Sequence, residues 1–183
     1  MPGNSETLAD VLARSHVALP VGLGWAATIA ARLQDMHRSD RRHGKVAPQS
    51  VRVNRDGPEL LQPKQDFWRE CTPDRDVRGF GAMFYEIVTG MPAPDADAEP
   101  IAPPTCTVGD GLDEIRTAAI HLALKCMGHL KARLNMRQAA MEVRLLWMQC
   151  RRIEARAKAE VTTLPVEEPA PPERWERVRS EVA

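Results

Sequence analysis

The segment from residue 72 to residue 90 constrains the fold more than any other part of the chain. Thr72 followed by Pro73 is typical of a helix start, because proline fits the first helical position, where its missing N–H is not needed. Gly90, just ahead of Pro92, is the matching stop. Between them, apolar residues recur at helical spacing: Val77, Phe80, Phe84 and Ile87. The pattern predicts a central, well-buried helix.

Helical spacing of apolar residues occurs in three further segments. Residues 20–37 repeat apolar side chains every three or four positions: Trp25, Ile29, Leu33 and Met36. A segment that starts near Asp110 carries Ile115, Ala119, Leu122 and Cys126 on one face. Asn135, with Gln138 three residues later, predicts the cap of a last helix that turns inward Ala140, Val143, Trp147 and Cys150. We expect the last two helices to pack together.

One segment predicts strands. Val51 and Val53 alternate with polar residues ahead of Asp56-Gly57, a dipeptide that favours a tight hairpin turn, and Leu60-Leu61 follows. The sequence therefore predicts a mainly α fold with one short β-hairpin. We expect a single domain over residues 1–153. The apolar pattern fades beyond it, so residues 154–183 are expected to form a proline-rich, charged linker or tail.

Composition and charge exclude several classes of partner. The 183 residues contain 25 Lys plus Arg and 25 Asp plus Glu, so no net charge attracts the chain to nucleic acid. Four Trp, three Phe and one Tyr are too few for a platform that stacks bases. The uncharged residues 17–31 contain Pro and Gly and are too short to span a membrane. We expect no nucleic-acid or membrane partner.

The cysteines indicate the compartment. Four cysteines show no C-x-x-C pair, and no convincing secretory signal precedes them, because acidic residues stand where such a signal is basic. They are therefore predicted to be buried or free thiols of a cytoplasmic protein.

A series of short strings, in order, resembles the C-terminal lobe of eukaryotic-type protein kinases over roughly residues 7–150. ETLADVL looks like the segment after the hinge, and residues 20–37 resemble the long helix before the catalytic loop. HGKVAPQSVRV is similar to the His-Arg-Asp-Leu-Lys-Pro-x-Asn-Ile pattern of that loop. DVRGFGAMFYEIVTG, which contains Asp76 and Gly81, is close to the family's Asp-Val-x-x-Phe-Gly helix. ALKCMGHLKARLNMRQAAMEVRLL is similar to the closing pair of helices.

The resemblance also marks what the catalytic loop lacks. His43 is kept, but Lys45 stands at the position of the base Asp and Ala47 at that of the phosphate-contacting Lys. Ser50 stands at the position of the metal-binding Asn. Because a lysine ammonium is cationic, it does not accept a substrate proton. The resemblance therefore implies a degenerate loop with no catalytic residue.

Metal binding is not expected. Pro63 falls at the position of the family's magnesium-binding Asp, and the literal Asp66-Phe67 follows three residues later. Asp66 is a weak candidate, because one carboxylate does not supply the octahedral ligands that Mg²⁺ requires. His37, His43 and Cys71 match no short zinc spacing. We expect no resident metal or cofactor, with ATP and Mg²⁺ only in an alternative function.

Four residues that match the family are assigned structural roles by the resemblance. Asp76 would bond the backbone of the 43–46 loop, with His43 packed beneath it; the alternative is that Asp76 is an ordinary helix-cap residue. Gly81 belongs to the matched helix. Arg133 stands where the family pairs an Arg with a buried Glu, and Glu70 is the nearby candidate, although a solvated Arg133 is the stronger expectation.

The resemblance implies a function without catalysis. No G-x-G-x-x-G and no V-A-I-K-like strand precedes Leu8, so we expect half of the nucleotide pocket to be missing. We expect a pseudokinase module, rather than an enzyme, that serves signalling or regulation through protein contacts. A protein partner or a second copy would cover the face that the other lobe covers in the family. The alternatives are a split or residual kinase that still binds ATP and phosphorylates Ser/Thr, and a helical domain with an accidental likeness.

Overall fold

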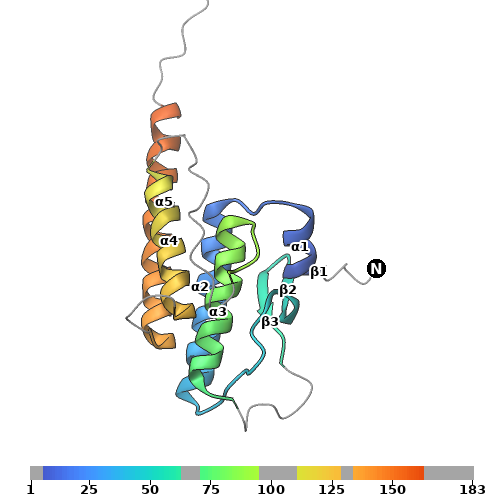
Figure 1. Ribbon diagram of the computed structural model, residues 1–183. Coiled ribbons are helices and arrows are strands. Elements are labelled where there is room, and N and C mark those ends of the chain that lie inside the picture. The colour runs from blue at the N-terminus through green and yellow to red at the C-terminus, as the bar shows by residue number, and fades with distance from the viewer. Residues whose placement is uncertain (1–5, 63–70, 95–110, 129–133, 163–183) are drawn as a thin grey trace, which may run out of the picture.

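The computed structural model describes residues 6–62, 71–94, 111–128 and 134–162, and this part of the chain is mainly helical (Figure 1). Four longer helices lie side by side, and a short helix and a small sheet lie beside two of them. The elements are β1 (Glu6–Thr7), α1 (Leu8–Arg14), α2 (Leu19–Arg38), the short 3-10 helix η1 (Pro48–Ser50), β2 (Val51–Asn54), β3 (Gly57–Leu60), α3 (Pro73–Thr89), α4 (Leu112–Met127) and α5 (Met136–Thr162).

Helix α3 occupies the centre and has the predicted bounds. It begins at Pro73, and Gly90 ends it in the left-handed conformation (φ 69°), which glycine adopts without a Cβ penalty. Phe80 and Phe84 are fully buried, and their rings stack with centroids 5.7 Å apart. The prediction of a central buried helix is confirmed.

Helices α2, α4 and α5 complete the helical layer and are close to their predicted ranges. Helix α5 packs against both α2 and α4, as expected for the closing pair. Its N-terminus carries the predicted cap: Gln138 N–H donates to Asn135 Oδ1 at 2.9 Å, and Asn135 N–H donates to Gln138 Oε1 at 3.0 Å. Among the described residues, no helix is long and apolar enough to cross a membrane.

The sheet has one strand more than the sequence predicts. The expected hairpin is present as β2 and β3, but β1 pairs antiparallel with β2, with Glu6 opposite Val53, so the sheet has the order β1-β2-β3. A strand of two residues is too short to show alternation, and its partner lies far along the chain. Thr7 then starts α1, accepting a hydrogen bond from Asp10 N–H while Asp10 Oδ2 accepts one from Thr7 N–H.

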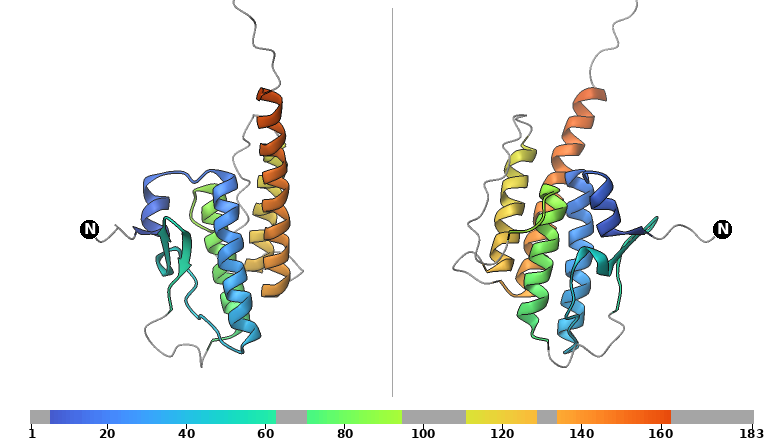
Figure 2. Two further views of the ribbon diagram at one scale, coloured as in Figure 1. Left: turned by 180° about the vertical axis from the view of Figure 1, so that it is seen from behind. Right: turned by 45° about the vertical axis from the view of Figure 1, so that its right-hand side comes forward.

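Helix α5 also continues beyond residue 153, where the sequence predicts the domain to give way to a tail. The helix runs to Thr162, and the side chains of residues 155–159 are exposed. This stretch, ARAKA, consists of strong helix formers, which favour the helix without an apolar face to bury. Figure 2 shows the end of α5 extending past the neighbouring helices. A fading apolar pattern therefore marks the end of packing on the core, not the end of the helix.

Candidate functional site around Asp76 and the loop after α2

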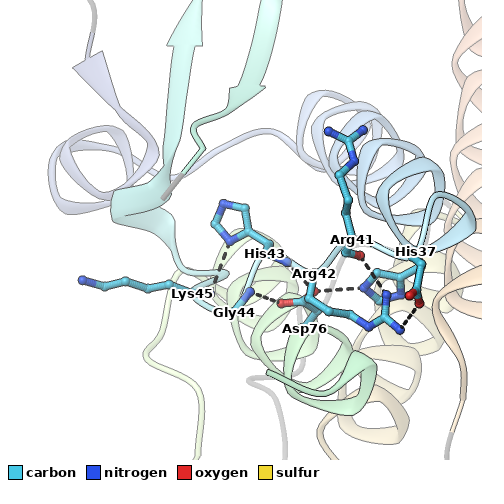
Figure 3. Close-up of polar contacts among 8 residues, drawn as sticks. His37, Arg41, Arg42, His43, Gly44, Lys45 and Asp76 are labelled. Carbon is cyan, nitrogen blue, oxygen red and sulfur yellow. Dashed lines mark hydrogen bonds and ion pairs between the residues drawn. The ribbon is translucent and has the colours of Figure 1, made fainter. Parts of the chain in front are cut away.

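The carboxylate of Asp76 joins the first turns of α3 to the loop that follows α2 (Figure 3). Its Oδ1 accepts a hydrogen bond from Gly44 N–H at 2.6 Å, and its Oδ2 accepts one from His43 N–H at 2.8 Å. His37 Nε2, from the last turn of α2, lies 2.9 Å from Oδ2. Three N–H groups from two segments therefore surround one fully buried carboxylate.

The hydrogen bonds keep Asp76 ionised. Burial raises the pKa of a carboxyl group, but the bonds from His37 and from the backbone of His43 and Gly44 outweigh it, so that the pKa of Asp76 lies below its ordinary value. The positive end of the α3 dipole, one turn away, favours the same charge. An ionised Asp76 holds the loop against the start of α3 at neutral pH.

Two glycines allow the loop to lie this close to α3. Gly44 has φ 76°, a conformation that L side chains rarely adopt, and it presents its N–H to Asp76. On the helix, a Cβ at Gly79 would lie 2.6 Å from the carbonyl oxygen of Val46. The first turns of α3 therefore fit the loop only because neither position carries a side chain.

His43 is the second buried polar residue of the site. Its side chain is 1% exposed, and Nε2 donates to the carbonyl oxygen of Leu61 at 2.6 Å. The other ring nitrogen, Nδ1, accepts from Lys45 N–H at 3.3 Å. His43 thus ties the loop to the chain that follows β3, while its own N–H bonds Asp76. The loop contact of Asp76 and the packed His43, both implied by the family resemblance, are present.

The remaining loop positions singled out by the sequence lie apart from Asp76. Lys45 is exposed, and its side chain points away from the carboxylate in Figure 3. Ser50 Oγ donates to the carbonyl oxygen of Ala47 at 2.7 Å and accepts from Ala47 N–H at 3.0 Å. The Ser50 hydroxyl is therefore engaged within the short turn that leads into β2.

Gly81 has a different structural place from the loop cluster. A Cβ at Gly81 would lie 2.7 Å from Cys126 Cβ and 2.8 Å from the carbonyl oxygen of Ala123, so Gly81 sets how closely α3 and α4 approach. Pro63, Asp66 and Arg133 lie outside the described residues. Of the predicted site residues, His43 and Asp76 are brought together, with Lys45 and Ser50 farther along the same loop.

His37 was not among the residues predicted for the site. Its spacing to His43 and Cys71 fits no zinc pattern, and the structure pairs its ring with the buried carboxylate of Asp76 in a partly buried contact. Its position in the last turn of the predicted helix 20–37, just before the loop that Asp76 was expected to bind, is the signal that could have identified it. Within the described residues, no group of three His, Cys, Asp or Glu side chains could hold a metal ion.

An open groove with a volume of about 380 Å³ lies between α2 and β3, on the side of the molecule that carries the sheet. Its walls combine apolar and charged residues: Thr28, Ile29, Arg32, Pro58, Glu59, Leu60, Leu61 and Gln62. Such a mixed surface suits contact with a protein rather than enclosure of a small molecule. The Asp76 cluster, by contrast, is buried and offers no base to an external substrate.

No protein-family model matches the chain, and no curated protein matches its sequence.

Proposed function

We propose that the chain is a degenerate kinase-like C-terminal lobe that transfers no phosphate and acts through protein contacts in signalling or regulation. The observation that carries the proposal is the pair of hydrogen bonds from His43 N–H and Gly44 N–H to the carboxylate of Asp76. The family resemblance implies this contact between the buried helix and the catalytic loop. These hydrogen bonds support the proposal because they join the two segments that the resemblance expects to be in contact.

The order of elements supports the same proposal. The chain runs from the long α2 through the loop and the β2–β3 hairpin to the buried α3, and it closes with α4 and α5. This is the order in which the matching strings occur. The two strings that resemble the loop and the buried helix belong to the segments that Asp76 joins.

The chemistry of the loop argues against phosphoryl transfer. That reaction needs a residue that orients or deprotonates the nucleophile and ligands that hold Mg²⁺. Lys45, at the position of the base, carries a cationic and exposed side chain. Ser50, at the position of a metal ligand, bonds its own turn through Ala47. Neither position supplies what the reaction requires.

The string ETLADVL, which resembles the segment after the hinge, contains β1, so the resemblance sets the family's other lobe against the side of the sheet. The groove between α2 and β3 is on this side, and its exposed rim includes Thr28 and Arg32. An open groove on this face would bind a partner protein or a second copy. We assign the protein contact to this face.

Unfolding midpoints test the proposal that the chain transfers no phosphate. They should be measured with and without millimolar ATP, in Mg²⁺ and again in EDTA, together with a phosphoryl-transfer assay on a generic Ser/Thr substrate. A ligand present at 100 times its Kd stabilises the folded state by about 2.7 kcal/mol, so binding would be visible. We expect no Mg²⁺-dependent shift and no transfer, and Lys45→Asp alone should create neither. A Mg²⁺-dependent rise or measurable transfer would favour a split kinase that still binds ATP.

Sedimentation velocity tests the proposed protein contact at the groove between α2 and β3. We expect the chain to self-associate or to bind an apolar dye, and Thr28→Glu to reduce both, because it places a charge at the groove. Thr117→Glu on α4 is the matched control, since both threonines are exposed and donate to the carbonyl oxygen four residues earlier. A clean monomer with low dye binding contradicts the assignment, as does an equal effect of the two substitutions.

A further inference from the structure

Helix α5 has a second apolar face that the fold does not bury. Its inner face includes Val143 and Cys150, which are both fully buried. On the outer face, Met141, Leu145 and Met148 are 58%, 51% and 43% exposed. These are three of the four large apolar side chains that are exposed within the described residues. Exposed apolar residues scattered singly need no explanation, but three on one helix face indicate a contact surface.

The spacing of these residues is that of a coiled-coil seam. The steps from Met141 to Leu145 and on to Met148 are four and three residues, which keeps the side chains on one stripe. The same alternation continues through the exposed Arg152, Ala155 and Ala159. We call residues 141, 145, 148, 152, 155 and 159 the outer seam. At 1.5 Å per residue it is about 27 Å long.

A row of basic side chains follows one edge of the outer seam. Its members are seven residues apart, and all are exposed: Arg137, Arg144, Arg151 and Lys158. They occupy the positions that flank a coiled-coil seam, where charge decides which partner binds. Arg151 also lies 3.9 Å from Glu154 on its own helix, a distance at which an exposed pair is weak. We call these four residues the basic row.

Pairing of α5 with a second copy places like charges together. An antiparallel pair sets the basic row of one helix against the basic row of the other. When Leu145 packs against Met148 of the other copy, for example, Arg144 lies opposite Arg151 and Arg137 lies opposite Lys158. A parallel pair sets Arg137 beside Glu142 of the other copy, which is favourable, but it also sets Arg151 beside Arg156 of the other copy. A second copy is therefore a poorer occupant than a helix of opposite charge.

The outer seam is also poorly suited to a lipid surface. Helices that lie in a membrane bury a broad apolar face. Here the large apolar side chains form a stripe one residue wide, and Arg152 interrupts it before the small Ala155 and Ala159. A narrow stripe of this kind matches the contact line of one partner helix.

From these contacts and charges we propose that the outer seam of α5 binds an amphipathic helix of another protein whose apolar stripe is flanked by acidic residues. Met141, Leu145 and Met148 pack against the partner's apolar stripe, and unbranched methionine adapts to its shape. The basic row selects acidic flanks and makes binding sensitive to salt. Helix α5 lies on the side of the molecule away from the sheet (Figure 2), and none of these contacts involves the loop that resembles a kinase, so the proposal does not depend on a kinase-like origin.

Two synthetic helical peptides test the proposal on the full chain. They share one Leu/Ile stripe, and one carries Glu at all flanking positions while the other carries Lys. Fluorescence anisotropy at 50 and 300 mM salt should show at least tenfold tighter binding of the acidic peptide, with a smaller difference at high salt. Equal affinities, tighter binding of the basic peptide, or binding of neither would overturn the proposal.

Substitutions locate the contact. The triple variant Arg137→Glu, Arg144→Glu and Arg151→Glu should reverse the preference toward the basic peptide. A matched triple at exposed arginines outside α5, Arg55→Glu, Arg75→Glu and Arg78→Glu, should leave the preference unchanged. If the matched triple reverses the preference as strongly, net charge rather than the basic row decides binding, and the proposal fails.

Two further measurements separate the other occupants. Leu145→Glu should weaken the acidic peptide at least tenfold without lowering the unfolding midpoint, because Leu145 is half exposed. If Leu145→Glu still binds the acidic peptide as tightly, the outer seam is not the contact surface. Phosphatidylserine vesicles should not bind the chain more tightly than the acidic peptide does, and the opposite order would assign the face to membranes. If the chain binds neither peptide but forms a dimer, and Leu145→Glu dissociates that dimer, the outer seam binds a second copy instead.

Discussion

Asp76 Oδ1 accepts a 2.6 Å hydrogen bond from the backbone N–H of Gly44, and this bond joins the start of α3 to a loop 32 residues earlier in the chain. Both residues are buried, and Gly44 holds a left-handed conformation (φ 76°) in which its N–H points at the carboxylate. Asp76 also accepts from His43 N–H, so one side chain fixes two consecutive peptide groups. The conformation of the loop therefore depends on this carboxylate.

Asp76→Asn should lower the free energy of unfolding by about 2 to 3 kcal/mol, because an amide retains one acceptor oxygen and leaves a buried N–H without its bond. Urea unfolding at pH 7 measures this difference. Asp56→Asn, in the exposed turn between β2 and β3, is the control and should change stability by less than about 0.5 kcal/mol. Equal effects of the two substitutions would mean that Asp76 does not hold the loop.

The contribution of Asp76 should also depend on pH. Its pKa is lowered in the folded state, so the stability it adds is complete above its unfolded pKa of about 4 and is lost as pH falls through the lower folded value. We expect the stability difference between the native chain and Asp76→Asn to shrink as the pH falls below about pH 4. Urea titrations from pH 7 to pH 3 test this. A difference that persists unchanged to pH 3 contradicts an ionised Asp76.

Gly81→Ala should destabilise the fold by about 1 to 3 kcal/mol, although alanine favours a helix over glycine by about 1 kcal/mol. The added Cβ would meet Cys126 Cβ at 2.7 Å and the carbonyl oxygen of Ala123 at 2.8 Å, and neither atom is the end of a flexible side chain. Thermal unfolding measures the loss. Gly24→Ala, whose Cβ would meet the Trp147 indole at 3.2 Å, should have a smaller effect. The opposite order would show that the α3–α4 contact adjusts freely.

Local signals accounted for much of the fold. Helix α3 was predictable from Pro73, its apolar spacing and Gly90, and the cap of α5 from Asn135 and Gln138, because these patterns act within a few residues. Strand β1 was not predictable, since its pairing with β2 comes from residues distant in sequence. The apolar pattern does not mark the end of α5, because exposed helix formers, rather than an apolar face, extend the helix to Thr162.

The candidate site was predictable in part, and for a different reason. The family resemblance identified Asp76 and His43 as partners through the loop, and their contacts follow from a carboxylate beside a helix N-terminus. His37 was missed because its contact needs the end of α2 and the start of α3 to meet in space. The outer seam of α5 was missed as well, because the inward face of that helix explained its apolar content.

Buried thiols provide the last prediction. Burial, together with the nearby Glu142 carboxylate, raises the pKa of the Cys126 thiol to about 12, and burial likewise raises that of Cys150. Since the thiolate is the reactive form, iodoacetamide at pH 8 should label the partly exposed Cys71 and reach Cys126 and Cys150 only in denaturant. Peptide mass spectrometry measures labelling at each site. In Gly81→Ala, which crowds Cys126, labelling of Cys126 should become faster. Native labelling of Cys126 as fast as that of Cys71 would contradict the packing of α4 against α3.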